Sequence, residues 1–161
     1  MPKLTKIDKD LYYFKFTLVD DKIDIDNERF TEQALYKMSE MYIGKIGFIG
    51  VNGQAYTARI FDSWVNKKNG VSEVEALAYM YLNDAIVEEV SDFLLGHDKF
   101  SLSCSCNSKR CSICGKNQFK ESCEHVKGKE YGNHIKCFYE LSDISDVYEW
   151  AAVVEPEEDK V

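Results

Sequence analysis

The pattern of hydrophobic and polar positions predicts four strands in the first half of the chain. Each segment is either rich in aromatic and β-branched residues or alternates between apolar and polar residues, as strands do. These segments are residues 11–19, 45–51, 56–65 and 71–82. The second and third are separated by Asn52-Gly53, a pair that is typical of a tight hairpin turn.

Two helices are predicted in the same region. Thr31 can cap a helix that ends before Gly44, because a threonine hydroxyl accepts a hydrogen bond from the first turn. Asn83 is predicted to cap a second helix, which ends at Gly96. The apolar residues at helical spacing, which form the predicted buried faces, are Ala34, Leu35, Met38, Met41 and Tyr42 in the first helix and Ile86, Val90, Phe93 and Leu94 in the second.

A period of two marks residues 100–106 as a further strand. Its apolar face carries Cys104 and Cys106, which we interpret as small buried hydrophobic residues, and its other face carries Ser101, Ser103 and Ser105. The chain then becomes polar and rich in glycine, before two late strands that are predicted at about 135–141 and 147–154.

These elements predict a mixed α/β (α+β) fold, in which a small, mostly antiparallel β-barrel is flanked by helices. No repeat or proline-rich linker divides the chain of 161 residues. We therefore expect one domain over residues 1–156, with a cysteine-rich insertion at 107–133 and an acidic tail at 157–161.

Composition narrows the classes of function. The formal net charge is −8, from 20 basic and 28 acidic residues, which disfavours binding to nucleic acid or to an anionic membrane surface. Apolar stretches are too short to cross a bilayer, and charged residues interrupt the first 20 positions as they would not in a secretory signal. The six cysteines are therefore expected to be reduced thiols rather than a disulfide framework.

Four residues in the polar segment have the chemistry of a metal site. Cys111 and Cys114 form a C-x-x-C pair, and Cys123 and His125 follow within 15 residues of its start. Zinc prefers a tetrahedron of such thiolates and imidazoles, and four protein ligands leave no open position, so we expect a structural zinc. His134 or Cys137 could replace His125 as the fourth ligand. The alternative interpretation is a polar loop with reduced, unliganded cysteines.

The order of motifs along residues 10–156 adds a resemblance to a known family. In chain order these motifs are Arg29-Phe30-Thr31, Gly44-Lys45, Thr57-Ala58-Arg59-Ile60-Phe61-Asp62, Phe100-Ser101-Leu102-Ser103, the cysteine cluster and Tyr148-Glu149-Trp150. The succession resembles the prohead (capsid-maturation) serine proteases of tailed phages, in the variants that carry a cysteine-rich insertion. The resemblance implies the fold of herpesvirus assemblins, a small antiparallel barrel wrapped by helices.

The resemblance also implies a serine protease triad, but one member is missing. Ser101 falls at the nucleophile, and Glu149 falls near the acid that orients the histidine. Gly50-Val51 occupy the expected place of the histidine. His97, four residues before Ser101, is an alternative base. Without a base a serine hydroxyl is a weak nucleophile, so it is uncertain from the sequence whether the chain is an enzyme.

The resulting hypothesis is a pseudoprotease of the phage capsid-assembly pathway. It would bind a capsid or scaffold protein in the host cytoplasm. Association with the virion and formation of a homo-oligomer are further alternatives. The alternative is an active capsid-maturation endopeptidase that uses Ser101. A third interpretation is an inhibitor or host-interaction protein on the same fold, or an unrelated zinc-stabilised binding module.

Overall fold

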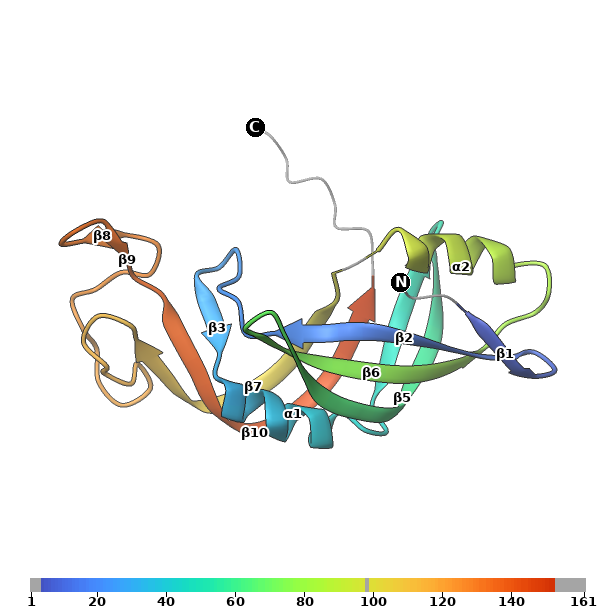
Figure 1. Cartoon of the computed structure of the whole chain (residues 1–161), viewed down its shortest axis with the longest axis horizontal. Helices are drawn as coiled ribbons and strands as arrows, with labels where there is room; N and C mark the ends of the chain where they lie inside the picture. Colours follow the sequence, from blue (N-terminus) through green and yellow to red (C-terminus); the bar gives the residue numbers. More distant parts are fainter. Residues whose placement is uncertain (1–3, 98, 153–161) are drawn as a thin grey trace.

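A computed structural model describes residues 4–97 and 99–152. In these residues there are two helices and ten strands, and eight of the strands form one sheet (Figure 1). In chain order the elements are β1 (Thr5–Asp8), β2 (Leu11–Asp20), β3 (Glu28–Phe30), α1 (Glu32–Met41), β4 (Ile46–Val51), β5 (Gln54–Lys68), β6 (Val71–Tyr81), α2 (Val87–Leu95), β7 (Ser101–Cys111), β8 (Glu130–Tyr131), β9 (Ile135–Lys136) and β10 (Tyr139–Ala152).

The large sheet has eight strands in the order β1-β2-β6-β5-β4-β10-β3, and β7 pairs with the other edge of β10. Most pairs are antiparallel, whereas β10 pairs in parallel with β3 and β4. Among the described residues the sheet does not close, so the predicted barrel is wrong, although the mixed α/β class is confirmed. The pairing of β10 explains the open sheet. One edge of β10 pairs with β7, and its other edge pairs with β3 near the start of the strand and with β4 near its end.

The predicted strands of the first half are confirmed with small changes in length. The β4–β5 hairpin turns at Asn52 and Gly53, which have positive φ angles of 50° and 79°, as a two-residue turn of this kind requires. The ambiguous segment 71–82 is a strand, β6, which lies between β2 and β5. Two short strands, β1 and β3, were not predicted, because neither segment has enough residues to show an alternation.

The two helices differ in how well their starts were predicted. Thr31 caps α1, and its hydroxyl accepts a hydrogen bond from the Ala34 amide at 3.2 Å. Asn83 does not cap α2: its side chain accepts a hydrogen bond from the Ala85 amide and forms a turn, and the helix begins only at Val87. Neither helix is long and apolar enough to cross a membrane, a statement that covers only the described part of the chain.

The end of the sheet differs from the prediction in two ways. First, β7 continues to Cys111, so the polar insertion begins after that residue and not at residue 107. Second, the segments predicted as 135–141 and 147–154 are mostly one long strand, β10, which bends at two irregularities in its pairing with β7. Asp143, with a positive φ of 55°, lies next to the first bend. Residues 153 and 154 and the predicted acidic tail lie outside the described residues.

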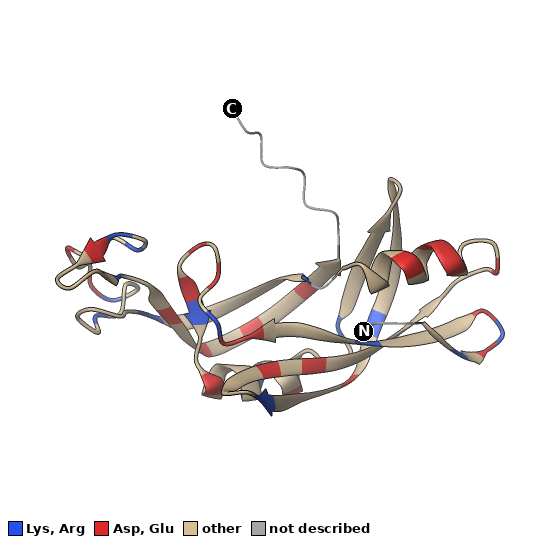
Figure 2. Cartoon of the chain, turned by 45° about the horizontal axis from the view of Figure 1, so that its top comes forward, with Lys and Arg blue, Asp and Glu red and all other residues tan. Residues whose placement is uncertain are grey.

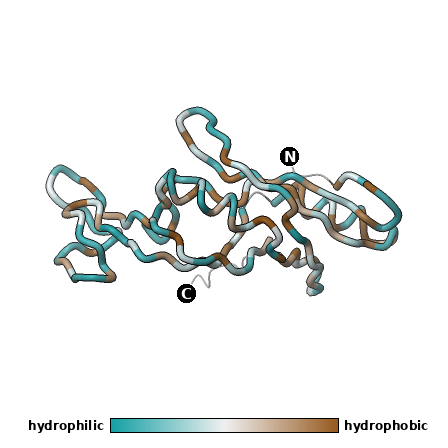
Figure 3. Tube along the Cα trace, turned by 90° about the horizontal axis from the view of Figure 1, so that it is seen from below, coloured by the Kyte–Doolittle hydropathy of each residue, from teal (hydrophilic) through white to brown (hydrophobic). Residues whose placement is uncertain are grey.

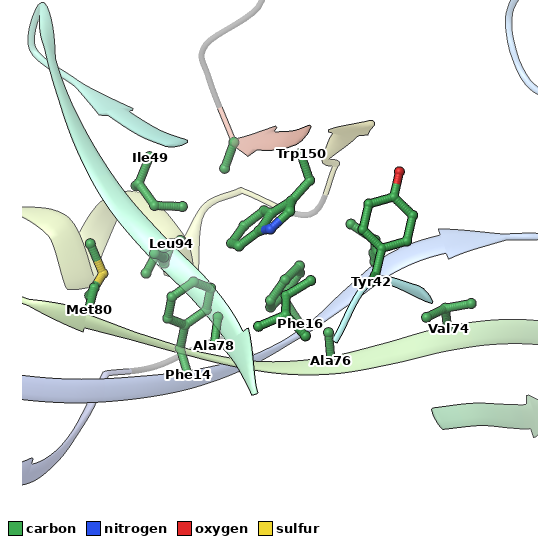
Figure 4. Close-up of a cluster of buried hydrophobic side chains, with 14 of the residues drawn as sticks. Phe14, Phe16, Tyr42, Ile49, Val74, Ala76, Ala78, Met80, Leu94 and Trp150 are labelled. Atoms are coloured by element: carbon green, nitrogen blue, oxygen red, sulfur yellow. The ribbon is translucent and has the colours of Figure 1, made fainter. Parts of the chain in front are cut away.

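Aromatic side chains from β2 and β10 form the centre of the core (Figure 4). The Phe16 and Trp150 rings are stacked with centroids 4.8 Å apart, and the Phe14 ring lies 5.2 Å from that of Phe16. Gly47 on β4 makes room for the indole, because a Cβ at this position would lie 2.1 Å from Trp150. The core therefore joins β10 to the N-terminal strands through a close contact that only glycine permits.

The segment between β7 and β10, residues 112–138, is here called the cysteine loop. It lies at one end of the molecule, beyond the end of the β7–β10 pair, while α2 lies toward the other end (Figure 1). Hydrophilic residues predominate along it (Figure 3), and of its large side chains Phe119, Val126 and Ile135 are exposed. Such a segment has little hydrophobic core of its own to hold it.

Candidate functional site

The first part of the cysteine loop is a tight turn at the end of β7. Cys111 is buried and pairs with Tyr139 across the sheet. Its carbonyl accepts a hydrogen bond from the Gly115 amide at 2.8 Å, and its sulfur accepts one from the Ile113 amide at 3.4 Å. Gly115 has a φ of +77°, which a residue with a Cβ rarely adopts. This turn returns Cys114 to the side of Cys111.

A buried asparagine fixes the path of the next residues. Asn117 donates from its side chain to the Asn107 carbonyl at 3.1 Å, and its side-chain oxygen accepts hydrogen bonds from the amides of Lys109 and Phe119, each at 3.1 Å. The loop is thereby attached to β7 by a side chain that is only 7% exposed. The role of Asn117 could not be predicted from the sequence, because only its burial distinguishes it from other loop asparagines.

The second part of the loop brings Cys123 and His125 to the turn. The side-chain amide of Gln118 donates to the Cys123 sulfur at 3.4 Å. The His125 ring contacts Tyr131 edge to face with centroids 4.9 Å apart, and the Tyr131 hydroxyl accepts a hydrogen bond from the Val126 amide at 2.8 Å. The loop therefore positions both residues through contacts of its own.

An ion pair attaches the loop to the sheet. Glu28 on β3 lies 3.0 Å from the Lys127 ammonium in the loop, and it also lies 3.5 Å from the Lys109 ammonium on β7. The backbone adds a hydrogen bond from the Tyr139 amide to the Asn27 carbonyl at 3.0 Å. The base of the loop is thus held by β3 as well as by β7 and β10.

Cys111, Cys114, Cys123 and His125 together form a cluster that could hold a metal ion. One ligand atom from each residue lies within 4.8 Å of the others. Zinc–sulfur bonds of about 2.3 Å in a tetrahedron place two sulfurs about 3.8 Å apart, so a small contraction completes the site. The Nδ1 atom of His125 is buried and has no hydrogen-bond partner, a costly state that a bond to a metal would relieve.

The alternative fourth ligands are less well placed. His134 is 90% exposed, and its ring lies 3.2 Å from the Glu130 carboxylate. Cys137 is buried with its sulfur 3.8 Å from that of Cys111, but it is not part of the four-residue cluster. All six cysteines, which lie in the described part of the chain, are free thiols there. The donor set of three cysteines and one histidine is one that structural zinc sites use.

The surroundings of the cluster lower the pKa of one of its thiols, that of Cys123. Desolvation raises the pKa of Cys123, but hydrogen bonds at the His125 backbone and from the side chains of Gln118, His125 and Cys114 outweigh it and lower this pKa to about 7. A backbone hydrogen bond at Lys116 lowers the pKa of Cys114, yet desolvation and hydrogen bonds with Cys111 and Cys123 leave it raised overall. A metal would complete the deprotonation of the cluster.

Cys104 and Cys106 differ from the cluster. Both are partly buried against the core, as predicted, though neither is fully enclosed. Burial raises the pKa of Cys104 to about 11, and it also raises that of Cys106. These two thiols remain protonated near neutral pH and are poor nucleophiles.

The two predicted triad positions line a single hollow of about 180 Å³. Ser101 on β7 lies opposite Ala151 on β10, and Ala151 lies opposite Phe48 on β4. Glu149 precedes Ala151 by two residues and therefore shares its face. The residues around the hollow are Phe48, Ser101, Leu102, Ser103, Glu149, Trp150 and Ala151.

No histidine is among the residues that line this hollow. The ring of His97 is stacked on Phe93, with centroids 4.9 Å apart, and meets Phe100 edge to face at 5.7 Å. No hydrogen bond joins it to Ser101 within the described ranges 4–97 and 99–152. The serine that bonds to Glu149 is instead Ser103, whose hydroxyl accepts from the Glu149 amide at 3.2 Å and donates to its carbonyl at 3.4 Å.

A second and larger hollow, of about 290 Å³, lies over β1, β2, β5 and β6 and was not predicted from the sequence. It is lined by the apolar and aromatic side chains Ile7, Leu11, Phe61, Tyr79 and Tyr81. A signal was available in the exposed aromatic residues of β5 and β6, but their common face depends on the register of strands that are distant in sequence.

Comparisons of the chain with protein-family models, with curated protein sequences and with solved structures gave no match.

Proposed function

We propose that the chain is a catalytically inactive relative of the prohead proteases that binds a capsid or scaffold protein during phage assembly in the host cytoplasm. The observation that carries this proposal is the serine hollow. Ser101 and Glu149 line it together, as the family resemblance requires of a nucleophile and an orienting acid, but the base that links them is lacking.

The residues at the expected place of the histidine support this view. The family resemblance expects an Asp-His pair where this chain has Gly50-Val51, at the end of β4. Neither residue provides a proton acceptor, and loss of the base from such a triad removes several orders of magnitude in rate because its members act as a unit.

The set of four ligands supports a structural rather than a catalytic role for the metal. Four protein ligands fill a zinc tetrahedron and leave no position for a reactive water. The metal would instead fix a polar loop that has little hydrophobic core.

The surface of α2 suggests the chemistry of the partner. Glu88, Glu89 and Asp92 are exposed on this helix (Figure 2), and the whole chain has a net charge of −8. Complementary charge favours association, so we expect the partner to present a basic surface. Whether the chain also associates with itself is a separate question, which the same binding experiment answers.

The test of inactivity is a cleavage and labelling assay on the zinc-loaded protein. We expect no cleavage of the capsid or scaffold protein encoded in the same genome, and no labelling of Ser101 by a fluorophosphonate, equal to the result for Ser101→Ala. Cleavage that Ser101→Ala abolishes would instead establish an active endopeptidase. His97→Ala, run beside it, would then show whether His97 is the base.

The test of binding is co-expression with the same capsid and scaffold proteins, followed by size-exclusion chromatography. We expect one of them to co-elute, with an affinity that falls as salt rises. Glu88→Lys together with Asp92→Lys should weaken the complex, whereas the matched reversals Asp24→Lys and Asp26→Lys, on the exposed loop before β3, should not. Capture of host factors without any capsid protein would contradict the proposal.

A further inference from the structure

Cys137 is the thiol outside the metal cluster that contacts one of its ligands. Its side chain is fully buried, and its sulfur lies 3.8 Å from the sulfur of Cys111. Cys104 and Cys106, the other two thiols outside the cluster, pack against the core of the sheet instead. The sequence alone offered Cys137 as an alternative ligand, but Cys137 is not part of the four-residue cluster, so its contact with Cys111 has another role.

The backbone holds the two cysteines in register. The Ser112 amide donates to the Phe138 carbonyl at 2.9 Å, and the Phe138 amide donates to the Ser112 hydroxyl at 3.0 Å. On its other side Cys137 is fixed by hydrogen bonds from its own amide to the Lys129 carbonyl at 2.9 Å and from the Gly128 amide to its carbonyl at 2.8 Å. The sulfur contact is thus part of the base of the loop.

We propose that Cys111 and Cys137 form an oxidation site, at which a peroxide joins the two sulfurs in a disulfide and the metal is released from the cysteine loop. The two sulfurs need to approach from 3.8 Å to about 2.05 Å. Cys137 lies between β9 and β10, outside any strand, so this shift does not require the main sheet to move.

The chemistry balances with hydrogen peroxide as the oxidant. The Cys111 thiolate attacks one peroxide oxygen, the O–O bond breaks, and a sulfenic acid and hydroxide form. The Cys137 thiol then attacks the sulfenic sulfur, the S–O bond breaks, and water leaves. Two thiols and one peroxide give one disulfide and two waters, and two electrons pass from sulfur to oxygen.

Loss of one thiolate would break the metal site. Cys114, Cys123 and His125 would remain, and three ligands hold zinc less tightly than the closed set of four. The competing reaction is a disulfide within the cluster, which Cys114 could start because it is the exposed one of the three cluster thiols. In the metal-bound protein, however, Cys111, Cys114 and Cys123 all bind the metal, so Cys137 is the free thiol next to the cluster that can react with an oxidised Cys111.

The experiment treats the full chain, loaded with one equivalent of zinc, with hydrogen peroxide. A chromogenic chelator measures the zinc released, and alkylation followed by non-reducing digestion and mass spectrometry maps the disulfides. We expect the Cys111–Cys137 disulfide to form first and in proportion to the zinc released. Reduction with dithiothreitol in the presence of zinc should restore the loaded protein.

Cys137→Ser should bind one zinc but release it with a half-time about ten times longer or more, because the resolving thiol is gone. The matched variant Cys104→Ser should release zinc at the wild-type rate. The cobalt-substituted spectrum of Cys137→Ser should keep the wild-type intensity of its sulfur-to-cobalt band, because Cys137 is not a ligand. A weaker band, or a first disulfide between Cys114 and another cluster cysteine in the wild-type protein, would overturn the proposal.

Discussion

The metal centre and the serine hollow lie near opposite ends of the same pair of strands, β7 and β10, but they differ in how complete their chemistry is. At the metal centre every group that a zinc tetrahedron needs is present within 4.8 Å, and hydrogen bonds hold the thiols in place. At the serine hollow two of the three predicted triad positions share a surface, and no histidine lines it. The comparison shows that the residues of a metal site are all brought together, whereas those of the predicted triad are not.

The largest effect should follow from loss of a metal ligand. Cys123→Ser or removal of zinc by a chelator should unfold the cysteine loop, because structural zinc sites contribute on the order of 10 kcal/mol to small metal-dependent modules and this loop has little apolar core. Hydrogen exchange should show lost protection in residues 112–138 while β2, β5 and β6 stay protected. His134→Ala is the matched control, since its exposed ring should leave zinc binding unchanged. Equal loss of protection in the main sheet would contradict the separation of the two regions.

Substitution of Trp150, which lines the serine hollow, should strongly destabilise the fold. Its indole is 1% exposed and stacks on Phe16, so Trp150→Ala should cost about 3–5 kcal/mol of unfolding free energy. Gly47→Ala tests the same contact from the other side, because its new Cβ would overlap the indole, and about 1–3 kcal/mol is expected. Urea denaturation measures both. The one-to-one binding of zinc should survive in both variants below the unfolding transition.

Acidification should separate the two regions as well. Metal binding needs deprotonated ligands, and the depressed pKa of Cys123, about 7, means that its thiolate is available above this pH and lost as the pH falls through it. The apparent zinc affinity should therefore fall at least about fivefold between pH 7 and pH 6, which a competition titration with a zinc indicator measures. Tryptophan fluorescence of the sheet should stay constant over this range. A simultaneous change would mean that the metal supports the sheet and not only the loop.

The same contrast explains which features the sequence could predict. The metal ligands follow one another within a short segment, so the spacing of Cys111, Cys114, Cys123 and His125 was enough to identify the cluster. The contact of Cys137 with Cys111 was not predictable as a contact, because it depends on how the chain returns through β8 and β9. Local spacing encodes the ligands, whereas the neighbours of the ligands come from the tertiary structure.

The sheet shows the same limit on a larger scale. Strands with strong alternation, such as β2 and β6, were predicted from their own residues. The open arrangement of the sheet was not predicted, because it results from the pairing of β10 with three different strands. The contact between Gly47 and the indole of Trp150 likewise joins two strands that are distant in sequence. Asn83 illustrates a smaller error, since its side chain is equally suited to a turn and to a helix cap.

The smallest effect should be that of Ser101 itself, and it is best measured against Ser103. Ser101→Ala should change the unfolding free energy by less than about 0.5 kcal/mol, because the side chain is exposed and has no hydrogen-bond partner among the described residues. Ser103→Ala should cost more, about 0.5–1 kcal/mol, since its hydroxyl bonds to the backbone of Glu149. The two serines lie on the same face of one strand, so their difference reports the bonds alone. If Ser101→Ala were instead more stable by 1 kcal/mol or more, the serine would be held at a cost to the fold, which is the behaviour of a residue kept for catalysis, and the inactive role proposed for the hollow would have to be abandoned.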